Sequence, residues 1–351
     1  MNGATGSRTI VLLMSGGVDS TVAALLLRRS GWRVLGLTLR IPGRDGRPVE
    51  TGEDAARVAA ELDIPHRVLD AEEAFREHVV EPFFRSYREG RTPNPCADCN
   101  RAVKFGLLMD AAAEWAGDAR VPVATGHYAR ILRTPSGARL ARAVDEARDQ
   151  SYFLCDVECT RLERVLFPLG ELTKLQVREI ARRSGLSAAE RPDSMEACFL
   201  AGTDYRIGLA DAGPGPIRDL SGTLLGRHGG LSRYTLGQRQ GLGLGIAAPR
   251  PLYVVRLDVA ENALVVGPRE SALRTVVDAE RPNLLAPELL GEYGGFLGKT
   301  RSRSPLTPCR IVRLDESGLS VEFETPQFAP APGQRLALYC GEVLAVSGTI
   351  S

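Results

Sequence analysis

The sequence has little lysine and no long hydrophobic run. None of its apolar stretches reaches the roughly 18 residues that a membrane-spanning helix needs, so no span is expected. The N-terminal stretch MNGATGSRTIVLLMSGG lacks the charged region and cleavage site of a signal peptide, which predicts a cytoplasmic location. In that compartment the seven cysteines are not expected to form a disulfide framework. Because only three of the 44 basic residues are lysine, we expect each lysine to be specific to its position: Lys104, Lys174 and Lys299.

Acidic residues are missing from two segments, although the net charge of the chain is only +1. One lies between Asp219 and Asp258, and the other between Glu292 and Asp315. Basic clusters without acids are typical of surfaces that bind phosphate backbones, whereas scattered solvated arginines are the alternative. The basic residues of the two segments are Arg227, Arg233, Arg239, Arg250, Arg256, Lys299, Arg301, Arg303, Arg310 and Arg313.

The chain of 351 residues is long enough for two or three domains. Its first half alternates short apolar runs, such as TIVLLM, with amphipathic helical stretches, such as STVAALLLRRSG. This alternation predicts an α/β domain with a parallel sheet over residues 1–204. A Gly- and Pro-rich segment, expected to be a small central domain, covers 205–270, and short alternating strands over 271–351 predict an antiparallel barrel or sandwich.

The hexapeptide SGGVDS, Ser15 to Ser20, stands between a predicted strand and a predicted helix. The glycines allow close approach of a phosphate to the backbone, and the following helix offers free amides. The lysine of a Walker loop is missing, and Asp19 stands in the loop instead. A carboxylate beside phosphates is expected to hold a metal ion, here Mg²⁺. A tight turn capped by Ser15 or Asp19 is the alternative.

Three cysteines stand out from the other four. Cys96 and Cys99 lie in GRTPNPCADCN, which the prolines predict to be a loop, and Cys198 lies in RPDSMEACFLAG. They are interpreted as metal ligands, a redox pair or ordinary thiols. Cys155, Cys159, Cys309 and Cys340 are expected to pack as small apolar residues, and a zinc site from the first two with Cys96 and Cys99 does not match standard spacing.

SGGVDS resembles the phosphate loop of the PP-loop ATP pyrophosphatase superfamily, whose members transfer AMP to a carbonyl or carboxyl oxygen. Further motifs, in order along the chain, are similar to those of the tRNA-specific 2-thiouridylase family: GRTPNPCADCNRAVKFG, ATGHYAR, ARDQSYFL, DSMEACFLAG, YTLGQRQGLGLG and PGQRLALYCGEVLAVSGTI. The resemblance covers nearly the whole chain. It implies an adenylating α/β domain of the adenine-nucleotide alpha-hydrolase type, a central domain and a C-terminal β-barrel. The implied reaction is 2-thiolation of the wobble uridine of tRNA.

The resemblance also implies roles for individual residues. Cys99 matches the nucleophile and Cys198 the cysteine that carries a persulfide. The implied ATP-binding positions are Leu13, Met14, Ser15, Gly16, Gly17, Val18, Asp19, Ser20, Leu39 and Gly126. The implied tRNA-contacting positions are Asn94, Pro95, Cys96, His127, Arg148, Asp149, Gln150, Arg301, Ser302 and Gln334.

Four of these positions depart from the family pattern. Leu39 stands where many relatives have methionine, and Arg148 replaces a lysine. Ser302 replaces an aromatic residue and cannot stack on a base. Cys96 replaces an aspartate, giving C-x-x-C instead of D-x-x-C.

The cysteine departure leaves two mechanisms open. In the first, a persulfide on Cys198 attacks the adenylated base, and Cys99 then releases the sulfur by forming a disulfide with Cys198. In the second, Cys96, Cys99 and Cys198 hold a [4Fe-4S] cluster with one open iron.

The resemblance implies a set of partners and excludes others. The tRNA anticodon stem-loop and a cysteine desulfurase or sulfur-relay donor are expected, but neither DNA nor a membrane. The alternatives are an adenylating sulfurtransferase acting elsewhere on tRNA, and a non-catalytic metal-containing RNA-binding protein.

Overall fold

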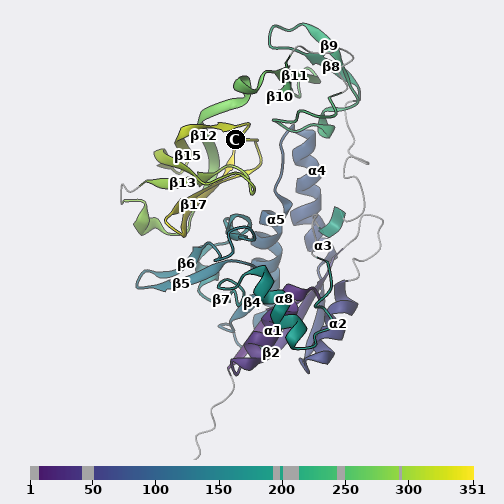
Figure 1. Ribbon diagram of the computed structural model, residues 1–351, viewed down its shortest axis with the longest axis vertical. Helices are drawn as coiled ribbons and strands as arrows, with labels where there is room; N and C mark the ends of the chain where they lie inside the picture. The colour runs from purple at the N-terminus through teal and green to yellow at the C-terminus, as the bar shows by residue number, and fades with distance from the viewer. Residues whose placement is uncertain (1–7, 42–50, 193–197, 201–212, 243–249, 292–294) are drawn as a thin grey trace, which may run out of the picture. The chain divides into compact units, whose positions relative to one another are not determined.

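The computed structural model describes residues 8–41, 51–192, 198–200, 213–242, 250–291 and 295–351 (Figure 1). The chain forms two compact units. Unit 1 comprises residues 1–79, 96–201 and 342–344, and unit 2 comprises residues 80–95, 202–341 and 345–351.

Unit 1 is built on a five-stranded parallel sheet, which confirms the predicted α/β class. Its strand order is β3-β2-β1-β4-β7, and the paired strands of β1, β2, β3, β4 and β7 all run parallel. From the central strand β1 the chain passes to one side through β2 and β3 and later to the other side through β4 and β7. Open α/β sheets bind ligands where the order reverses in this way, at the carboxyl ends of the strands. The bounds are β1 Thr9–Leu13, β2 Arg33–Arg40, β3 His66–Asp70, β4 Val123–Thr125 and β7 Val165–Leu166.

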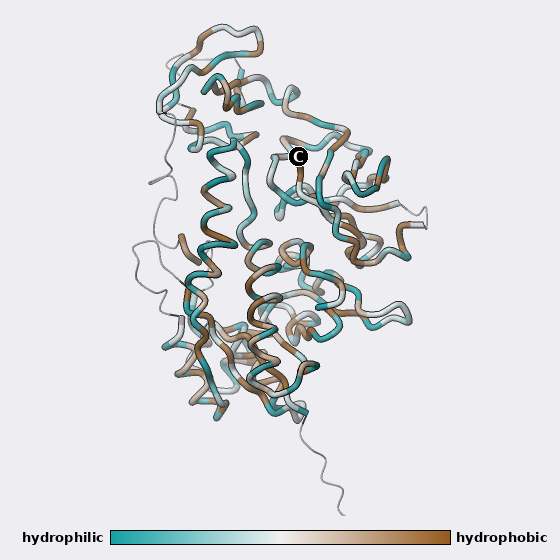
Figure 2. The backbone as a smooth tube through the Cα atoms, turned by 180° about the vertical axis from the view of Figure 1, so that it is seen from behind, coloured by the Kyte–Doolittle hydropathy of each residue, from teal (hydrophilic) through white to brown (hydrophobic). Residues whose placement is uncertain are grey.

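Helices cover both faces of this sheet. Helices α1 (Val18–Arg29), α2 (Thr51–Glu61) and α8 (Lys174–Arg183) share one apolar core with Ile10 and Leu12 of β1. Side chains alternate along a strand, so Val11 between them faces the other side, where α6 (Leu108–Ala116) contacts β1. Figure 2 shows hydrophobic and hydrophilic residues alternating along the helices, as this half-buried arrangement requires.

The start of α8 follows the sequence signals closely. Thr173 is its N-cap: the hydroxyl accepts from the Gln176 amide, and the Gln176 side chain accepts from the Thr173 amide. This capping box fixes the start of the helix at Thr173. Beyond the last turn, Gly185 adopts a φ of +64°, a conformation in which glycine commonly ends a helix.

The cysteine motif lies on a helix, so the predicted loop is wrong at this point. The turn α5 (Pro95–Asp98), the π-helix η2 (Cys99–Leu107) and α6 follow one another directly. Pro95 occupies the first helical position, where its missing N–H is not needed. Pro93 therefore precedes the helix and Pro95 begins it, so neither proline interrupts it. Residues 72–88 are also helical, as α3 (Glu72–Phe75), the π-helix η1 (Arg76–Val80) and α4 (Glu81–Arg88).

The smaller sheet of unit 2 has the order β10-β11-β8-β9. Strands β10 and β11 form an antiparallel hairpin, with Asn262 at a positive φ of 46° in its turn. The sheet packs its own apolar core, which includes Ile217, Val254 and Leu264. The bounds are β8 Gly215–Arg218, β9 Leu224–His228, β10 Tyr253–Asp258 and β11 Ala263–Gly267.

The last six strands form a closed antiparallel barrel, as one of the two predicted alternatives. Their order is β12-β15-β14-β13-β16-β17, and β17 pairs back with β12. Phe323 and Tyr339 are buried in its interior. A Cβ on Gly298 would lie 2.6 Å from the Phe323 ring, so a glycine makes room for that ring. The bounds are β12 Leu273–Leu284, β13 Phe296–Lys299, β14 Thr307–Asp315, β15 Gly318–Phe328, β16 Arg335–Cys340 and β17 Val343–Ile350.

The remaining elements are short. In unit 1 they are β5 Arg130–Thr134, β6 Gly137–Ala141, η3 Ser151–Leu154, α7 Cys159–Leu162 and η4 Cys198–Leu200. In unit 2 they are η5 Leu231–Arg233, η6 Arg269–Ala272 and η7 Pro287–Leu289.

Candidate nucleotide and thiol site

The loop between β1 and α1 turns at Gly16, whose φ is +74°. A Cβ at Gly16 would lie 2.6 Å from Asp54 Cβ in α2, so both the dihedral and the space require glycine. Gly17 is the N-cap of α1, which begins at Val18. The loop thus leads into the free amides and positive dipole end of a 12-residue helix, an arrangement suited to phosphate.

The Ser20 hydroxyl links the two ends of this loop by hydrogen bonds. The Ser15 amide donates to Ser20 Oγ at 3.3 Å, and Ser20 Oγ donates to the Gly17 carbonyl at 3.1 Å. From the next strand, Thr38 Oγ1 donates to the Met14 carbonyl at 2.9 Å. The loop is therefore held in shape before any ligand arrives, which lowers the entropy cost of binding.

The predicted nucleotide positions lie at three neighbouring strand ends. Leu39 lies near the end of β2, and Gly126 directly follows β4. A Cβ on Gly126 would lie 2.9 Å from the Ser20 amide nitrogen and 3.0 Å from the Asp19 carbonyl carbon. The end of β4 can therefore approach the start of α1 only with a glycine at this position.

Asp19 has two partners that sequence reasoning did not name as site residues. Lys174 Nζ lies 2.7 and 2.8 Å from its two carboxylate oxygens, and the Tyr128 hydroxyl donates to Oδ1 at 2.8 Å. The Lys174 side chain is only 9% exposed, against 33% for Asp19. The scarcity of lysine, together with the position of Lys174 directly after the helix cap Thr173, was the signal that could have found it.

The loop fits a phosphate-bound Mg²⁺ ion in its donor chemistry. Mg²⁺ binds through one or two carboxylates together with substrate phosphates, and Asp19 supplies one carboxylate beside the phosphate loop. Asp19 is a third exposed, so a Mg²⁺ ion could reach its carboxylate. The ion would neutralise a pyrophosphate leaving group here.

The predicted run Arg148, Asp149 and Gln150 folds back onto the same site. The backbone amide of Gln150 donates to the Tyr128 carbonyl at 2.8 Å, and the backbone amide of Tyr128 donates to Gln150 Oε1, also at 2.8 Å. Asp149 accepts from the amides of Ala143 and Ser151, at 3.1 Å each. Arg148 is exposed. Asp149 and Gln150 therefore shape the loop, and Arg148 is the member that presents its side chain to solvent.

The three candidate cysteines all lie in unit 1 and act on one another electrostatically. Burial raises the pKa of the Cys99 thiol to about 12, and the Lys104 ammonium opposes this shift. The pKa values of Cys96 and Cys198 are raised by the same desolvation, although both residues are more exposed, and Lys104 again opposes it. In a π-helix the i→i+5 hydrogen bond places Lys104 one turn after Cys99, which explains this proximity.

The metal interpretation of these cysteines gains no support. Among the described residues, no three histidine, cysteine or acidic side chains are arranged to hold a metal ion. The ligand set of Cys96, Cys99 and Cys198 for a [4Fe-4S] cluster stays a prediction, and we derive no step through a cluster. The described part of the chain likewise contains no zinc site at Cys96, Cys99, Cys155 and Cys159.

His127 lies just after β4, and its ring is near two aromatic rings. Its Nδ1 is 2.7 Å from Thr125 Oγ1, and its ring centroid is 6.1 Å from Phe105 and 6.0 Å from Phe167. Burial first, and Lys104 second, hold the pKa of His127 well below its usual value. A neutral imidazole can accept a hydrogen bond from a base or ribose, and its predicted tRNA contact stays a prediction.

The predicted tRNA residues of unit 2 have structural partners within that unit. Gln334 Nε2 donates to the carbonyls of Thr92 and Pro93, at 3.0 and 3.1 Å, directly before the buried Asn94 and the half-buried Pro95. Arg301 donates to the carbonyls of Leu236 and Ala329, at 2.8 and 2.6 Å, and Ser302 is half-buried beside it. Gln334 and Arg301 therefore position neighbouring segments, whatever else they contact.

Two arginines of the second acid-free segment do have acidic partners. Arg310 pairs with Glu322 on the adjacent strand, with its Nε 2.8 Å from Oε2, and Arg313 Nε lies 3.9 Å from Asp315. Strand pairing brings Glu322 opposite Arg310, whereas Asp315 lies on the same strand as Arg313 and ends the segment. Arg227, Arg233 and Arg239 of the first segment are exposed.

Comparisons with known proteins identify the family. The tRNA methyl transferase HUP domain model matches residues 8–202. The tRNA-specific 2-thiouridylase MnmA of Roseiflexus castenholzii is 42% identical, over 97% of this chain and 99% of that protein. The chain belongs to the tRNA-specific 2-thiouridylase family. Another 2-thiouridylase, MnmA 1 of Syntrophus aciditrophicus, is 43% identical over 98% of this chain and 92% of its own length. Two more models match along the chain, the tRNA methyl transferase PRC-barrel domain over 208–268 and the aminomethyltransferase beta-barrel domain over 274–350.

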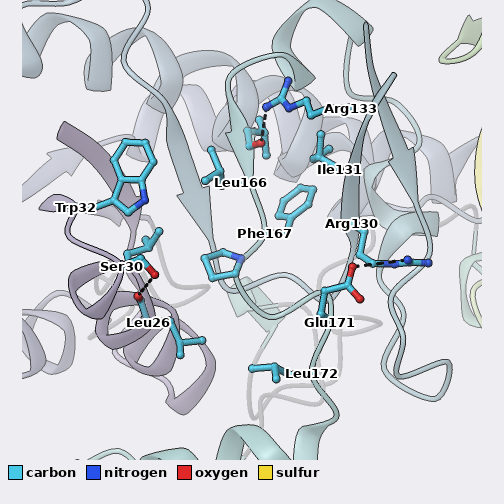
Figure 3. A pocket seen from close by; sticks show the side chains of 13 residues that line it. Leu26, Ser30, Trp32, Arg130, Ile131, Arg133, Leu166, Phe167, Glu171 and Leu172 are labelled. Atoms are coloured by element: carbon cyan, nitrogen blue, oxygen red, sulfur yellow. Dashed lines mark hydrogen bonds and ion pairs between the residues drawn. The ribbon is translucent and has the colours of Figure 1, made fainter. Parts of the chain in front are cut away.

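Unit 1 also holds a cavity of about 540 Å³ that contains none of the predicted site residues. Trp32, Leu166 and Phe167 line it, and Figure 3 shows Arg130 beside Glu171 at its edge. The ion pairs of Arg130 with Glu171 and of Arg133 with Glu163 neutralise its charged groups. We assign no ligand to it. No helix in the described ranges is long and apolar enough to cross a membrane.

Proposed function

We propose that this protein uses ATP to replace the C2 oxygen of the wobble uridine, position 34 of tRNA, with sulfur. One observation carries the proposal: a single unit contains a phosphate loop at the switch point of its sheet and three thiols around Lys104. The first arrangement suits adenylation and the second suits sulfur transfer. Membership of the 2-thiouridylase family supports the choice of tRNA as substrate.

Adenylation makes the C2 oxygen a leaving group. The carbonyl oxygen attacks the α-phosphorus of ATP, the bond to the β-phosphate breaks, and pyrophosphate leaves. The loop amides and the start of α1 receive this pyrophosphate, and Asp19 would hold the Mg²⁺ that balances its charge. Leu39 and Gly126 line the adenosine side of the loop. Lys174 and Tyr128 orient the Asp19 carboxylate.

Two cysteines carry out the sulfur transfer. A cysteine desulfurase or sulfur-relay protein supplies a persulfide on Cys198. Its terminal sulfur attacks C2, and AMP leaves with the former C2 oxygen. Cys99 then attacks the inner sulfur of Cys198, so the S–S bond breaks, the sulfur stays on the base, and a Cys99–Cys198 disulfide forms. A dithiol reductant supplies the two electrons that restore both thiols.

Cys99 needs activation before it can act. With a pKa of about 12 it is a thiol at neutral pH, and its proton must leave as it attacks. Its location in the first turns of the helix that begins at Pro95, together with Lys104, favours the thiolate. Cys96 would contact the target base together with Asn94 and Pro95.

The remaining predicted site residues are proposed to contact the anticodon stem-loop of tRNA. A wobble base lies in a single-stranded loop and can be turned out into a pocket, while phosphate contacts supply most of the affinity. The proposed contacts are His127, Arg148, Asp149, Gln150, Arg301, Ser302 and Gln334, and the exposed arginines of 220–257 are further candidates for phosphate contacts. We expect no DNA partner and a cytoplasmic location.

The test compares wild type with single alanine variants of the cysteines, incubated with tRNA, ATP, a persulfide donor and a dithiol. Cys99→Ala and Cys198→Ala should lose 2-thiouridine formation, whereas Cys340→Ala in the barrel should retain it. If wild type releases no pyrophosphate in a tRNA-dependent manner, the enzyme function is wrong. Iron and cluster absorbance in anaerobically purified protein, lost in Cys96→Ala together with activity, would instead support the cluster mechanism.

A further inference from the structure

The small sheet of unit 2 has an apolar core on one face and arginines on the other. Strand pairing aligns Arg218 of β8 and Arg256 of β10 with Val265 of β11, which lies between them. The preceding positions of β8 and β11, Ile217 and Leu264, are buried in the core of the sheet. Because side chains alternate between the two faces of a sheet, Arg218, Val265 and Arg256 share the face opposite that core.

A cavity of about 520 Å³ lies on this face of the sheet. Val265 forms part of its wall, and the arginines that line it are Arg218, Arg256 and Arg274. All its lining residues belong to unit 2. Arg218 and Arg274 lie outside the two acid-free segments, so charge patterning along the sequence did not point to them. The volume is within the range of protein ligand sites, about 300–1,000 Å³.

The guanidinium groups of this cavity are available to a ligand. Among the described residues, no acidic side chain pairs with Arg218. Arg256 Nη2 lies 3.5 Å from Asp258 Oδ2, and the Arg256 side chain is 66% exposed, so water weakens this ion pair. Arg274 donates through Nη1 to two backbone carbonyls, at 3.0 and 2.8 Å. These two bonds hold Arg274 at the cavity and leave its other two nitrogens for a further acceptor.

One carboxylate opposes these three positive charges. Asp219 also lines the cavity, and its Oδ1 accepts from the Ser221 hydroxyl at 2.6 Å and from the amides of Ser221 and Thr223 at 2.9 Å each. The Ser221 hydroxyl, and after it the two amides, hold the pKa of Asp219 below its usual value. The carboxylate is therefore bound within the turn after β8. Three arginines against one aspartate leave the lining with an excess of positive charge.

We propose that this arginine cavity, lined by Arg218, Arg256 and Arg274, binds the phosphate backbone of the tRNA substrate. The proposal rests on the proposed function, which supplies tRNA as the substrate. It adds a site in unit 2 that contacts phosphates and not the reacting base. Contacts of this kind add affinity and fix the orientation of a nucleic acid without reading its sequence.

The spacing of the arginines favours a chain of phosphates over one small anion. Neighbouring strands lie about 4.8 Å apart, so the backbones of Arg218 and Arg256 are separated by about 10 Å, with Val265 between them. A single phosphate is already satisfied by one arginine, whose planar fork binds two of its oxygens. Separate guanidinium groups on both sides of Val265 can instead contact successive phosphates of one strand.

The matched control is Arg310 in the barrel of the same unit. Its side chain is 78% exposed, but its Nε lies 2.8 Å from Glu322 Oε2. Arg310→Gln removes the same formal charge as Arg218→Gln and leaves the arginine cavity unchanged. An effect of net charge alone should therefore appear in both variants, whereas an effect of the cavity should appear only in Arg218→Gln.

The first experiment measures the dissociation constant of the full chain for a tRNA with uridine at position 34, between roughly 50 and 200 mM KCl. Each phosphate contact contributes roughly 0.7–0.9 to the slope of log Kd against log salt concentration. Arg218→Gln combined with Arg256→Gln should therefore lower this slope by about 1.5 and weaken binding about tenfold at the lowest salt concentration. Arg310→Gln should keep the wild-type slope, and so should Arg218→Lys, which retains the charge.

A second experiment distinguishes a backbone site from a site for a free anion. Phenylglyoxal modifies accessible arginines, and peptide mass spectrometry gives the rate of modification at Arg218 and at Arg310. Bound tRNA should slow modification of Arg218 by about threefold or more and leave Arg310 unchanged. Inorganic phosphate, at the same total phosphate concentration, should protect neither residue.

Two results would overturn the proposal: a wild-type salt slope in the double variant, or protection of Arg218 by inorganic phosphate equal to that by tRNA. Steady-state thiolation separates this failure from failure of the proposed function. If the proposed function is wrong, wild type forms no 2-thiouridine. If only the arginine cavity is wrong, wild type and the double variant form it with the same KM for tRNA. The proposal predicts a raised KM for tRNA in the double variant and an unchanged kcat.

Discussion

Replacing Lys174 by methionine tests the ion pair at the centre of the nucleotide site. The substitution keeps the length of the side chain but removes the cation from Asp19, leaving the Tyr128 hydroxyl as its partner. Exposed pairs contribute roughly 0–1 kcal/mol, and removal of one partner of a buried pair costs about 3–5 kcal/mol. Since Lys174 is 9% exposed and Asp19 is 33% exposed, we expect a loss of about 2 kcal/mol in the free energy of unfolding of unit 1.

Tryptophan fluorescence in urea gives this quantity for unit 1 alone, because both tryptophans, Trp32 and Trp115, lie there. The assay is a double-mutant cycle with Asp19→Asn. The double variant should be more stable than the two single losses predict, by at least about 1 kcal/mol, because it leaves no unpaired charge. A coupling within about 0.3 kcal/mol of zero would show that the two side chains do not act as a pair and would refute this reasoning.

Three further outcomes follow from single residues. Gly126→Ala should abolish ATP-dependent pyrophosphate release without unfolding unit 1, because the added Cβ would lie 2.9 Å from the Ser20 amide; unchanged release would contradict this. Alkylation of Cys99 should rise about tenfold per pH unit up to pH 11, because its pKa is about 12, and Lys104→Met should slow it at every pH by raising that pKa further. An equal rate in wild type and Lys104→Met would exclude this role for the lysine. Phe323→Ala should destabilise the barrel by about 3–5 kcal/mol, since the ring is 1% exposed; a loss below 1 kcal/mol by calorimetry would show that the barrel collapses to fill the space.

Patterning along the chain predicted much of unit 1. The apolar run TIVLLM and the following Gly-Gly turn placed β1 and α1 correctly, because a buried parallel strand and a helix start both leave local signals. The capping residues of α8 are likewise local. The barrel strands were recognised, but closure of the ring depends on the pairing of β12 with β17, which no local pattern encodes.

The misses have a common physical origin. Pro95 was interpreted as part of a loop, although a proline is also favoured at the first position of a helix. Lys174 lies 155 positions from Asp19, and Arg191 lies 175 positions from Gly16, so these contacts exist only after the sheet has assembled. Arg310 looked unpaired because its partner Glu322 lies beyond a strand turn. Sequence patterns reveal the residues that lie within motifs. The residues that hold those motifs in position are revealed only by the contacts of the folded structure.

The most direct test of the account is nucleoside mass spectrometry of tRNA after reaction with the purified protein, Mg·ATP, a persulfide donor and a dithiol. The account predicts 2-thiouridine at position 34 only and one pyrophosphate released for each sulfur inserted by wild type. Cys198→Ala should form no 2-thiouridine, although it can still release pyrophosphate. Sulfur at another position, or 2-thiouridine formed without pyrophosphate release, would contradict it.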